Sequence, residues 1–412
     1  MGNCESLFIQ KPYIECTYQI DDVNNKIRIM NNKCGEEINN DLETKIKIAN
    51  CCKEEKLSFK MKFNETGEKI IYFIIEGKLL NMSYMFRNCS SLKKIRFVSV
   101  DTDQVTKMNS MFSGCYQLES VDLSNFNTIQ VNDMNSMFYK CFNIKVIKGI
   151  NNFKTNNVTI MKKLFYSCLE LESLDLSNFN TNNVTDMGYM FSKCYKLKEI
   201  IGITKFNTSN VTSMKSMFME NVEMTNLDLS KFDTANVNDM SFMFCKCYSL
   251  KEIKGINDFK TNKVTKMNSM FQECTILDNL DLSNYNTSNV TNMEFMFDKC
   301  VSLKHIKGIN NFDLTNVIKS QKLKISQNKN SNPDNNVQKM TIIFISSDQK
   351  INCKIECMKT DKFYKIQDKL YLKYPQLKNL DINYLAEGQL ISKSASLEEN
   401  NVKDGTRIII DI

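Results

Sequence analysis

The sequence of 412 residues has no tryptophan, a single histidine, three prolines and twelve glycines. Since His305 is the one histidine, catalytic triads and multi-histidine metal sites are excluded unless this residue serves. The low proline and glycine content excludes collagen-like and proline-rich fibres. No apolar run approaches the ~18 residues of a membrane span, and neither a P-loop nor a dinucleotide-binding glycine motif is present. We therefore expect no enzymatic activity, no cofactor and no metal.

The balance of charge is only mildly basic, with 54 Lys and Arg against 47 Asp and Glu, a net +7. This is far from the charge of a nucleic-acid-binding domain, and no nucleic-acid partner is expected. The first residues, MGNCESLFIQ, lack the basic and apolar regions of a secretory signal. We therefore expect a cytoplasmic protein whose 16 cysteines are reduced.

The N-terminal segment, residues 1–10, fits the lipidation pattern M-G-x-x-x-[ST] over Met1 to Ser6. The pattern predicts myristoylation of Gly2, and Cys4 lies where a palmitoyl chain could be added. A single myristoyl chain binds membranes only marginally, so Cys4 would supply the second anchor. Acylation would place the protein at the cytoplasmic face of a membrane; the alternative is an ordinary Met-Gly start.

The strongest signal is a repeat, M-x-x-M-F-x-x-C, which occurs fully or nearly so nine times at intervals of 26 or 27 residues. Its phenylalanines are Phe86, Phe112, Phe138, Phe165, Phe191, Phe218, Phe244, Phe271 and Phe297. A cysteine follows three residues later in every unit except one, where Asn221 stands instead. Such a period predicts a solenoid, because one unit alone cannot bury its apolar side and stacked units can share a core.

Each unit combines two apolar patterns. The residues Met134, Met137, Phe138 and Cys141 follow i, i+3, i+4, i+7. This spacing predicts a short helix or 3₁₀ turn. Leu174 and Leu176 alternate with Asp175, which predicts a short strand. We expect the cysteine column to be a buried core column rather than a metal or redox site, since free cysteine packs as a small apolar residue.

Two types of unit alternate along the repeat. The longer type carries one additional glycine, at Gly149, Gly202, Gly255 and Gly308, which a bulge or tight bend would need. Beside it runs the series Asp122, Lys148, Asp175, Ile201, Asp228, Lys254, Asp281 and Lys307. Stacking would place Asp on Lys, with roughly 0.2–1 kcal/mol gained for each pair.

The unit L-x-x-L-D-L-S-x-F-N-T-x-N-V-T-x-M-x-x-M-F-x-x-C resembles the BspA-like leucine-rich repeat over residues 82–318. The resemblance implies a leucine-rich-repeat-like solenoid of about nine units that binds proteins, often as an extracellular adhesin. The absence of a secretory signal departs from that last property. Triplets such as Asn183-Val184-Thr185 belong to the repeat, so we do not interpret them as glycosylation sites.

The segments that flank the repeat differ from it. Residues 11–81 contain short alternating apolar segments between Asn- and Asp-rich turns, and predict a β-rich cap over the first unit. Residues 319–339 carry five Lys and one Asp with few apolar residues, which predicts a basic flexible linker.

Residues 340–412 have predicted elements in the order ββαβββ, and resemble ubiquitin. The match is best at 365–369, 385–390 and 397–412. It implies a β-grasp domain beside the solenoid, so the predicted fold class is mixed β and α/β. Unlike ubiquitin, the chain ends Asp411-Ile412 with no Gly-Gly, which would prevent conjugation. The positions that correspond to ubiquitin's binding face are Tyr384 and Asp411.

The predicted function is a non-enzymatic adaptor. The solenoid would bind one protein through outward residues that differ between units, of which we single out Glu119, Lys145, Lys198, Lys251, Lys304 and His305. Simple surface drift would give the same pattern. The ubiquitin-like domain would dock a second protein, such as a receptor of the ubiquitin–proteasome system. The alternative is a structural or adhesive surface protein like the bacterial BspA-type proteins.

Overall fold

The computed structural model describes residues 11–34, 36–50, 53–317, 339–346, 351–361, 363–374, 377, 382–387, 389–391 and 396–411. The chain divides into two units, Met1–Ser326 and Gln327–Ile412. The predicted lipidation sites Gly2 and Cys4 lie outside the described residues, as does the predicted linker except for Lys339, which begins a strand.

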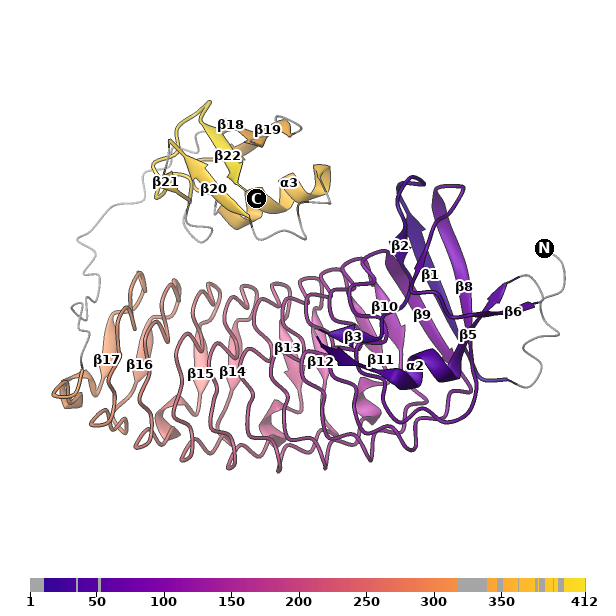
Figure 1. Ribbon diagram of the computed structural model, residues 1–412. Helices are drawn as coiled ribbons and strands as arrows, with labels where there is room; N and C mark the ends of the chain where they lie inside the picture. Colours follow the sequence, from indigo (N-terminus) through magenta and orange to yellow (C-terminus); the bar gives the residue numbers. More distant parts are fainter. Residues whose placement is uncertain are drawn as a thin grey trace. The chain divides into compact units, whose positions relative to one another are not determined.

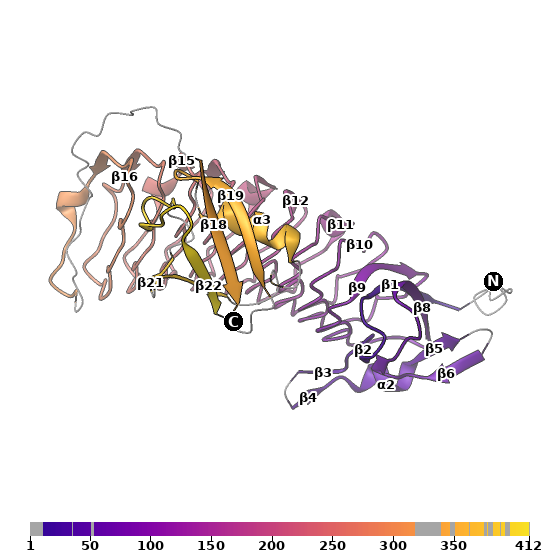
Figure 2. The same ribbon diagram turned by 90° about the horizontal axis from the view of Figure 1, so that it is seen from above.

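A seven-stranded sheet joins the N-terminal segment to the repeat (Figures 1 and 2). Its strands, in sheet order, are β11 (Val146–Lys148), β10 (Ser120–Asp122), β9 (Leu92–Val98), β1 (Tyr13–Ile20), β8 (Gly67–Ile75), β5 (Ile46–Asn50) and β6 (Lys53–Lys56). Strand β1 is antiparallel to β8 and to β9, whereas β9, β10 and β11 are parallel. The edge of the first repeat strand is therefore paired rather than open.

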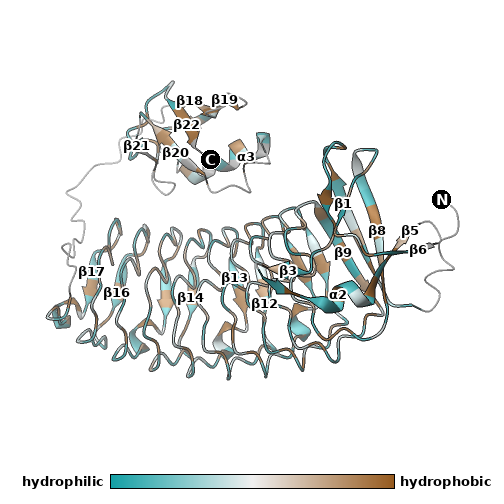
Figure 3. Cartoon of the chain, in the orientation of Figure 1, coloured by the Kyte–Doolittle hydropathy of each residue, from teal (hydrophilic) through white to brown (hydrophobic). Residues whose placement is uncertain are grey.

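Smaller elements complete this region. They are β2 (Ile27–Arg28) paired with β7 (Lys60–Met61), β3 (Lys33–Cys34) paired with β4 (Glu37–Ile38), and the helix α2 (Asn40–Lys45). The sequence analysis did not predict α2. In Figure 3 this helix is largely hydrophilic, whereas strands of the repeat such as β14 carry hydrophobic residues.

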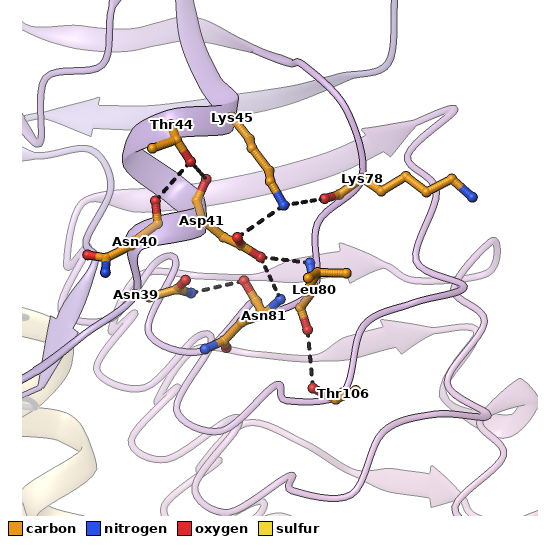
Figure 4. A network of polar contacts seen from close by, with 9 residues as sticks. All are labelled: Asn39, Asn40, Asp41, Thr44, Lys45, Lys78, Leu80, Asn81 and Thr106. Carbon is orange, nitrogen blue, oxygen red and sulfur yellow. Dashed lines mark hydrogen bonds and ion pairs between the residues drawn. The ribbon is translucent and has the colours of Figure 1, made fainter.

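Helix α2 closes the backbone edge of the first coil (Figure 4). A carboxylate oxygen of Asp41 accepts hydrogen bonds from the backbone N–H groups of Leu80 (2.8 Å) and Asn81 (3.1 Å). The side-chain amide of Asn39 donates to the carbonyls of Asn81 and Ser83, both at 2.9 Å. In the next coil, Thr106 N–H donates to Leu80 O instead. Asp41 and Asn39 thus supply the hydrogen-bond acceptor and donor that the backbone of a preceding coil supplies to the later coils.

Replacing Asp41 with alanine should destabilise the N-terminal unit by about 1–3 kcal/mol, because two backbone donors lose their acceptor. Urea denaturation followed by circular dichroism measures this. Asp41→Asn keeps one acceptor oxygen and should cost less. A stability of Asp41→Ala equal to that of the unchanged protein would contradict the capping role.

The repeat folds as stacked coils, numbered 1 to 9 here after Phe86 to Phe297. A continuous column of parallel bridges runs from Asn81 through Lys107 and onward to Asn292, nine positions joined by eight steps. On another side, β9, β10 and β11 are consecutive parallel strands, and the later strands pair in twos: β12 (Ser173–Asp175) with β13 (Glu199–Ile201), β14 (Asn226–Asp228) with β15 (Glu252–Lys254), and β16 (Asn279–Asp281) with β17 (His305–Lys307). The predicted solenoid is confirmed, with two alternating types of coil (Figure 1).

The sequence predicts a short helix or a 3₁₀ turn in M-x-x-M-F-x-x-C; the helix is wrong, and the segment forms turns with i→i+3 hydrogen bonds. Each half is a separate turn closed by an i→i+3 hydrogen bond, such as Met111 N–H to Met108 O (3.3 Å). The third residue of each turn has a positive φ, as at Ser110 (54°) and Gly114 (75°). The intervening N–H groups donate to the next coil, such as Ser110 N–H to Asn135 O (2.9 Å). A helix would use these donors internally, and the coils could not bond to one another.

The additional glycine of the longer coils begins a 3₁₀ turn, so the predicted tight bend is confirmed. These turns are η1 (Ile150–Asn152), η2 (Ile203–Lys205), η3 (Ile256–Asp258) and η4 (Ile309–Asn311), and each follows a glycine with φ between 81° and 87°. The predicted charge ladder is also present. Lys148, Lys254 and Lys307 pair with Asp122, Asp228 and Asp281 at 2.8, 3.0 and 2.9 Å.

The C-terminal unit is a five-stranded mixed sheet with one helix. Its elements are β18 (Lys339–Ser346), β19 (Asn352–Met358), α3 (Phe363–Lys373), β20 (Asn383–Ala386), β21 (Gln389–Leu390) and β22 (Arg407–Asp411). The sheet order is β19-β18-β22-β20-β21, with β18 parallel to β22 and the other pairs antiparallel. Phe363, Ile366 and Leu370 of α3 are fully buried, as the predicted helix face requires.

Candidate protein-interaction surface

The repeat motif itself is occupied in holding the coils together. Each motif threonine is buried and donates to a carbonyl of the next coil, as Thr155 Oγ1 does to Asn180 O (2.8 Å). The motif asparagine donates to a carbonyl of the coil before, as Asn183 Nδ2 does to Asn156 O (2.7 Å). These two columns account for the N-T-x-N-V segment of the repeat. The side chains left free for other contacts are therefore mainly those outside the motif.

The column cysteines are buried and free, as predicted: Cys89, Cys115, Cys141, Cys168, Cys194, Cys247, Cys274 and Cys300. From coil 2 onward, each column thiol lies against a carbonyl of the coil before, such as Cys194 Sγ against Phe165 O (3.1 Å). Asn221 takes the cysteine position in coil 6, and its Oδ1 accepts from Cys194 N–H (3.1 Å). Burial raises the pKa of these thiols, to about 12 for Cys194, Cys247 and Cys300.

The buried thiols should make the solenoid less stable at high pH. The folded state holds its thiol protons up to about pH 12, whereas an unfolded thiol loses its proton near pH 8.5. The stabilisation is therefore complete below about pH 8.5 and is lost as the pH rises toward 12. At pH 7.5, Cys194→Ala should cost about 1 kcal/mol through a small cavity. At pH 9.5 this cost should vanish, because the unchanged protein loses about 1 kcal/mol for that thiol. Urea unfolding with reductant at both pH values measures the difference. A cost independent of pH would contradict the prediction.

Five of the predicted surface residues lie in one column, immediately before or at the start of the short strands. The column reads Glu119, Lys145, Glu172, Lys198, Thr225, Lys251, Asp278 and Lys304, joined in twos by backbone bonds such as Lys198 N–H to Glu172 O (2.9 Å). Lysine alternates in this column with an acidic residue or, at position 225, a threonine, so its variation follows the two-coil period. Lys198 forms an ion pair with Glu172 at 3.4 Å, so part of the charge of this column is neutralised within the column itself. His305 is exposed at the start of β17, as predicted.

Tyr384 is not a surface residue. Its side chain is fully buried, and its hydroxyl lies 3.2 Å from Gln367 Nε2 and 3.3 Å from Tyr371 Oη. The prediction was wrong by one position along β20, which reverses the face in a strand. Asp411 is placed by its backbone alone, opposite Asn383 at the end of β22. The outward face of this sheet instead carries Ile409, which is 46% exposed.

A cluster of tyrosines and lysines on the turns of coils 3 to 6 was missed by the sequence analysis. This Tyr–Lys patch consists of Tyr139, Lys140, Lys162, Lys163, Tyr166, Tyr189, Lys193 and Lys215. The rings of Tyr139 and Tyr166 stack with centroids 5.0 Å apart, and Tyr189 meets Tyr166 edge to face at 6.1 Å. All eight residues occupy the outward positions of M-x-x-M-F-x-x-C. Aligning those positions instead of the motif would have revealed the patch.

Three of the five lysines of the patch lie over tyrosine rings. Lys163 Nζ is 5.5 Å from the ring centre of Tyr139 and 5.6 Å from that of Tyr189. Lys140 Nζ is 5.6 Å from Tyr139, and Lys215 Nζ is 6.0 Å from Tyr189. These distances fit cation–π contacts. Most paired lysines of the solenoid contact a carboxylate instead, and within the patch Lys162 does so with Asp186 at 3.0 Å.

Two other kinds of site find no support in the described part of the chain. Its histidine, cysteine and carboxylate side chains nowhere form a group of three or more that could hold a metal ion. None of its helices has the length and apolarity needed to cross a bilayer.

The fold defines a solenoid repeat protein with a separate small C-terminal unit. Three overlapping segments, residues 61–173, 142–253 and 219–337, match the family described as "Mycoplasma protein of unknown function, DUF285". Together they cover more than half of the chain, which therefore belongs to this family.

No curated protein matches the chain. Among solved structures, a leucine rich cell surface protein from Faecalibacterium prausnitzii A2-165 is similar, with 15% identity over 57% of this chain and 83% of that one. Its TM-score of 0.27 is too low to support any conclusion about this chain.

Proposed function

We propose that this chain is a non-enzymatic scaffold whose solenoid binds a protein partner. One observation carries the proposal: the motif side chains form the core and the coil-to-coil ladders, while the outward turn positions change along the solenoid. Coils 3 to 6 present the Tyr–Lys patch, whereas coils 7 to 9 present Phe242, Lys246, Glu294, Phe295, Asp298 and Lys299 among others. A constant core with a varied surface suits recognition of an extended partner.

We propose further that residues 340–412 form a ubiquitin-like domain that docks a second partner. The element order and the sheet order β19-β18-β22-β20-β21, with its central parallel pair, support this. A receptor of the ubiquitin–proteasome system is what the sequence resemblance implied, and nothing in the comparisons supports that choice. The outer edge of β19 is an unsuitable docking edge, because Lys369 and Lys373 donate to its carbonyls at Glu356 (2.9 Å) and Lys354 (3.1 Å).

The location of the protein belongs to the same proposal. We propose a cytoplasmic protein that reaches a membrane through acylation of Gly2 and Cys4. Mass spectrometry of the native N-terminus decides this: an unmodified Gly2 would rule the anchor out.

The test of the scaffold is a comparison of partners. Full-length protein and a version ending after Ile318 are expressed with the same tag in cells, and the proteins recovered with each are identified. The solenoid partner should appear with both, and the second partner only with the full chain. Identical sets of partners would refute the second docking site, and recovery of no specific protein with either would refute the scaffold.

A second candidate function is a structural or adhesive surface protein, which is what the resemblance of the repeat unit to the BspA-type proteins implies. Labelling of intact cells with a membrane-impermeable biotin reagent separates the two. Labelled protein would favour the surface function, and protein labelled only after permeabilisation the scaffold.

A further inference from the structure

We infer that the Tyr–Lys patch is the binding site for an acidic segment of a partner protein. This inference rests on the proposed scaffold function and names the surface and the chemistry of its partner. The patch concentrates five lysines on the outward turn positions of coils 3 to 6, where the same positions hold one carboxylate, Glu220. In coils 7 to 9 the same positions hold two lysines and three acidic residues. The solenoid therefore changes the sign of its charge along one face.

Three lysines of the patch differ from most paired lysines of the solenoid in what they contact. Lys140, Lys163 and Lys215 form no ion pair with any residue that the structure describes, and each lies over a tyrosine ring. Contact with the rings limits the freedom of these long side chains without neutralising their charge. Less conformational entropy is then lost when an anion binds, which favours affinity. A surface lysine that serves only solubility needs no such support.

The tyrosine stack has defined limits. Tyr139 and Tyr166 occupy the same motif position in coils 3 and 4. That position holds Ser113 in coil 2 and Ser192 in coil 5, so the stack ends there. Tyr189, from the adjacent turn of coil 5, packs beside Tyr166 next to Ser192. The rings thus form one compact group across three coils, with lysines on both flanks.

The geometry favours a protein over other anionic partners. Tyr139 and Tyr166 each cover one face of the other, and lysine ammonium groups lie over Tyr139 and Tyr189, which leaves little ring face for stacking with nucleic-acid bases or sugar rings. Among the patch residues none is a large aliphatic side chain that could enter a lipid surface. What the patch offers is several ammonium groups on successive coils, three of which lie over tyrosine rings. Carboxylates along an extended acidic segment match such an array.

The experiment uses full-length protein and a fluorescein-labelled peptide of 20 residues with alternating Glu and Ser, in fluorescence anisotropy at low and moderate salt. The patch variant is K140E/K163E/K215E. The matched control, K145E/K246E/K251E, makes the same change in net charge at lysines outside the patch. We expect the patch variant to bind the peptide at least about tenfold more weakly, and the control to change by less than about twofold. Equal losses in the two variants would overturn the inference.

Further arms separate the partner classes. Heparin, a single-stranded oligonucleotide and phosphatidylserine-containing vesicles are tested at the same salt concentration. Stronger dependence on the patch for any of these than for the peptide would overturn the assignment to an acidic protein. Because Glu on these turns could disturb folding, K140Q/K163Q/K215Q is measured too, and should show a smaller loss in the same direction. The patch variant is also used to recover partners from cells. If it recovers the same partners as the unchanged protein, this inference is refuted, while the scaffold function still stands.

Discussion

Replacing Gly255 with alanine should destabilise the solenoid by about 3 kcal/mol or more. A Cβ atom at this position would lie 2.3 Å from Ser230 Cα and 2.5 Å from Ser230 N, both backbone atoms of the neighbouring coil. Neither can move without separating the coils. The positive φ of 81° adds the usual cost of a left-handed conformation for a residue with a side chain. Thermal and urea unfolding measure the loss.

Gly77→Ala is the matched control. Gly77 has the same φ of 81°, but nothing lies within 4 Å of the position of its Cβ. Its substitution should cost only the conformational part, about 1–2 kcal/mol. The comparison matters because many residues of this chain adopt a positive φ without being glycine, such as Ser110 and Lys140. If the two variants lose equal stability, close approach of the coils is not the reason for glycine at position 255.

Replacing Phe191 with alanine should cost about 3–5 kcal/mol, because it removes a fully buried ring from the centre of the core. Phe191 stacks between Phe165 and Phe218, with ring centroids 5.9 and 5.7 Å away. The cavity would interrupt a column that runs through the coils, and in a solenoid each coil is stabilised mainly by its neighbours. Chemical denaturation of the full-length chain measures this loss.

Phe295→Ala provides the comparison for that variant. Phe295 is in coil 9 and 43% exposed, at an outward turn position with φ of 59°. Phe295→Ala should destabilise the protein by well under half as much as Phe191→Ala, because most of the destabilisation on removing a ring comes from the apolar surface that the ring had buried. A similar effect of both substitutions would show that the phenylalanine column does not control stability.

The core of the solenoid was predictable because its information is local and repeated. Phe191 and its equivalents recur at a fixed period, and a period of apolar residues identifies buried columns whatever the backbone conformation. The Asp122–Lys148 ion pair was predictable too, because the alternation of two unit types places Asp of one coil next to Lys of the following coil. The helix prediction failed for the same reason: i, i+3, i+4, i+7 is the spacing of one helix face and also of two successive turns. Only the hydrogen bonds between coils distinguish the two.

The sequence by itself determined the period, the number of coils, the buried columns and the glycine positions, because each depends on residues a fixed distance apart along the chain. The tertiary structure decided which outward side chains meet. Lys163 contacts Tyr139 and Tyr189, in the coils before and after its own, and no single unit shows that grouping. It likewise decided that Tyr384 is buried, because a shift of one residue in a strand reverses its faces. Asp41 became a cap only because α2 reaches the first coil, some forty residues further along the chain. Surfaces and caps depend on contacts between distant segments, and the repeat period carries no information about those.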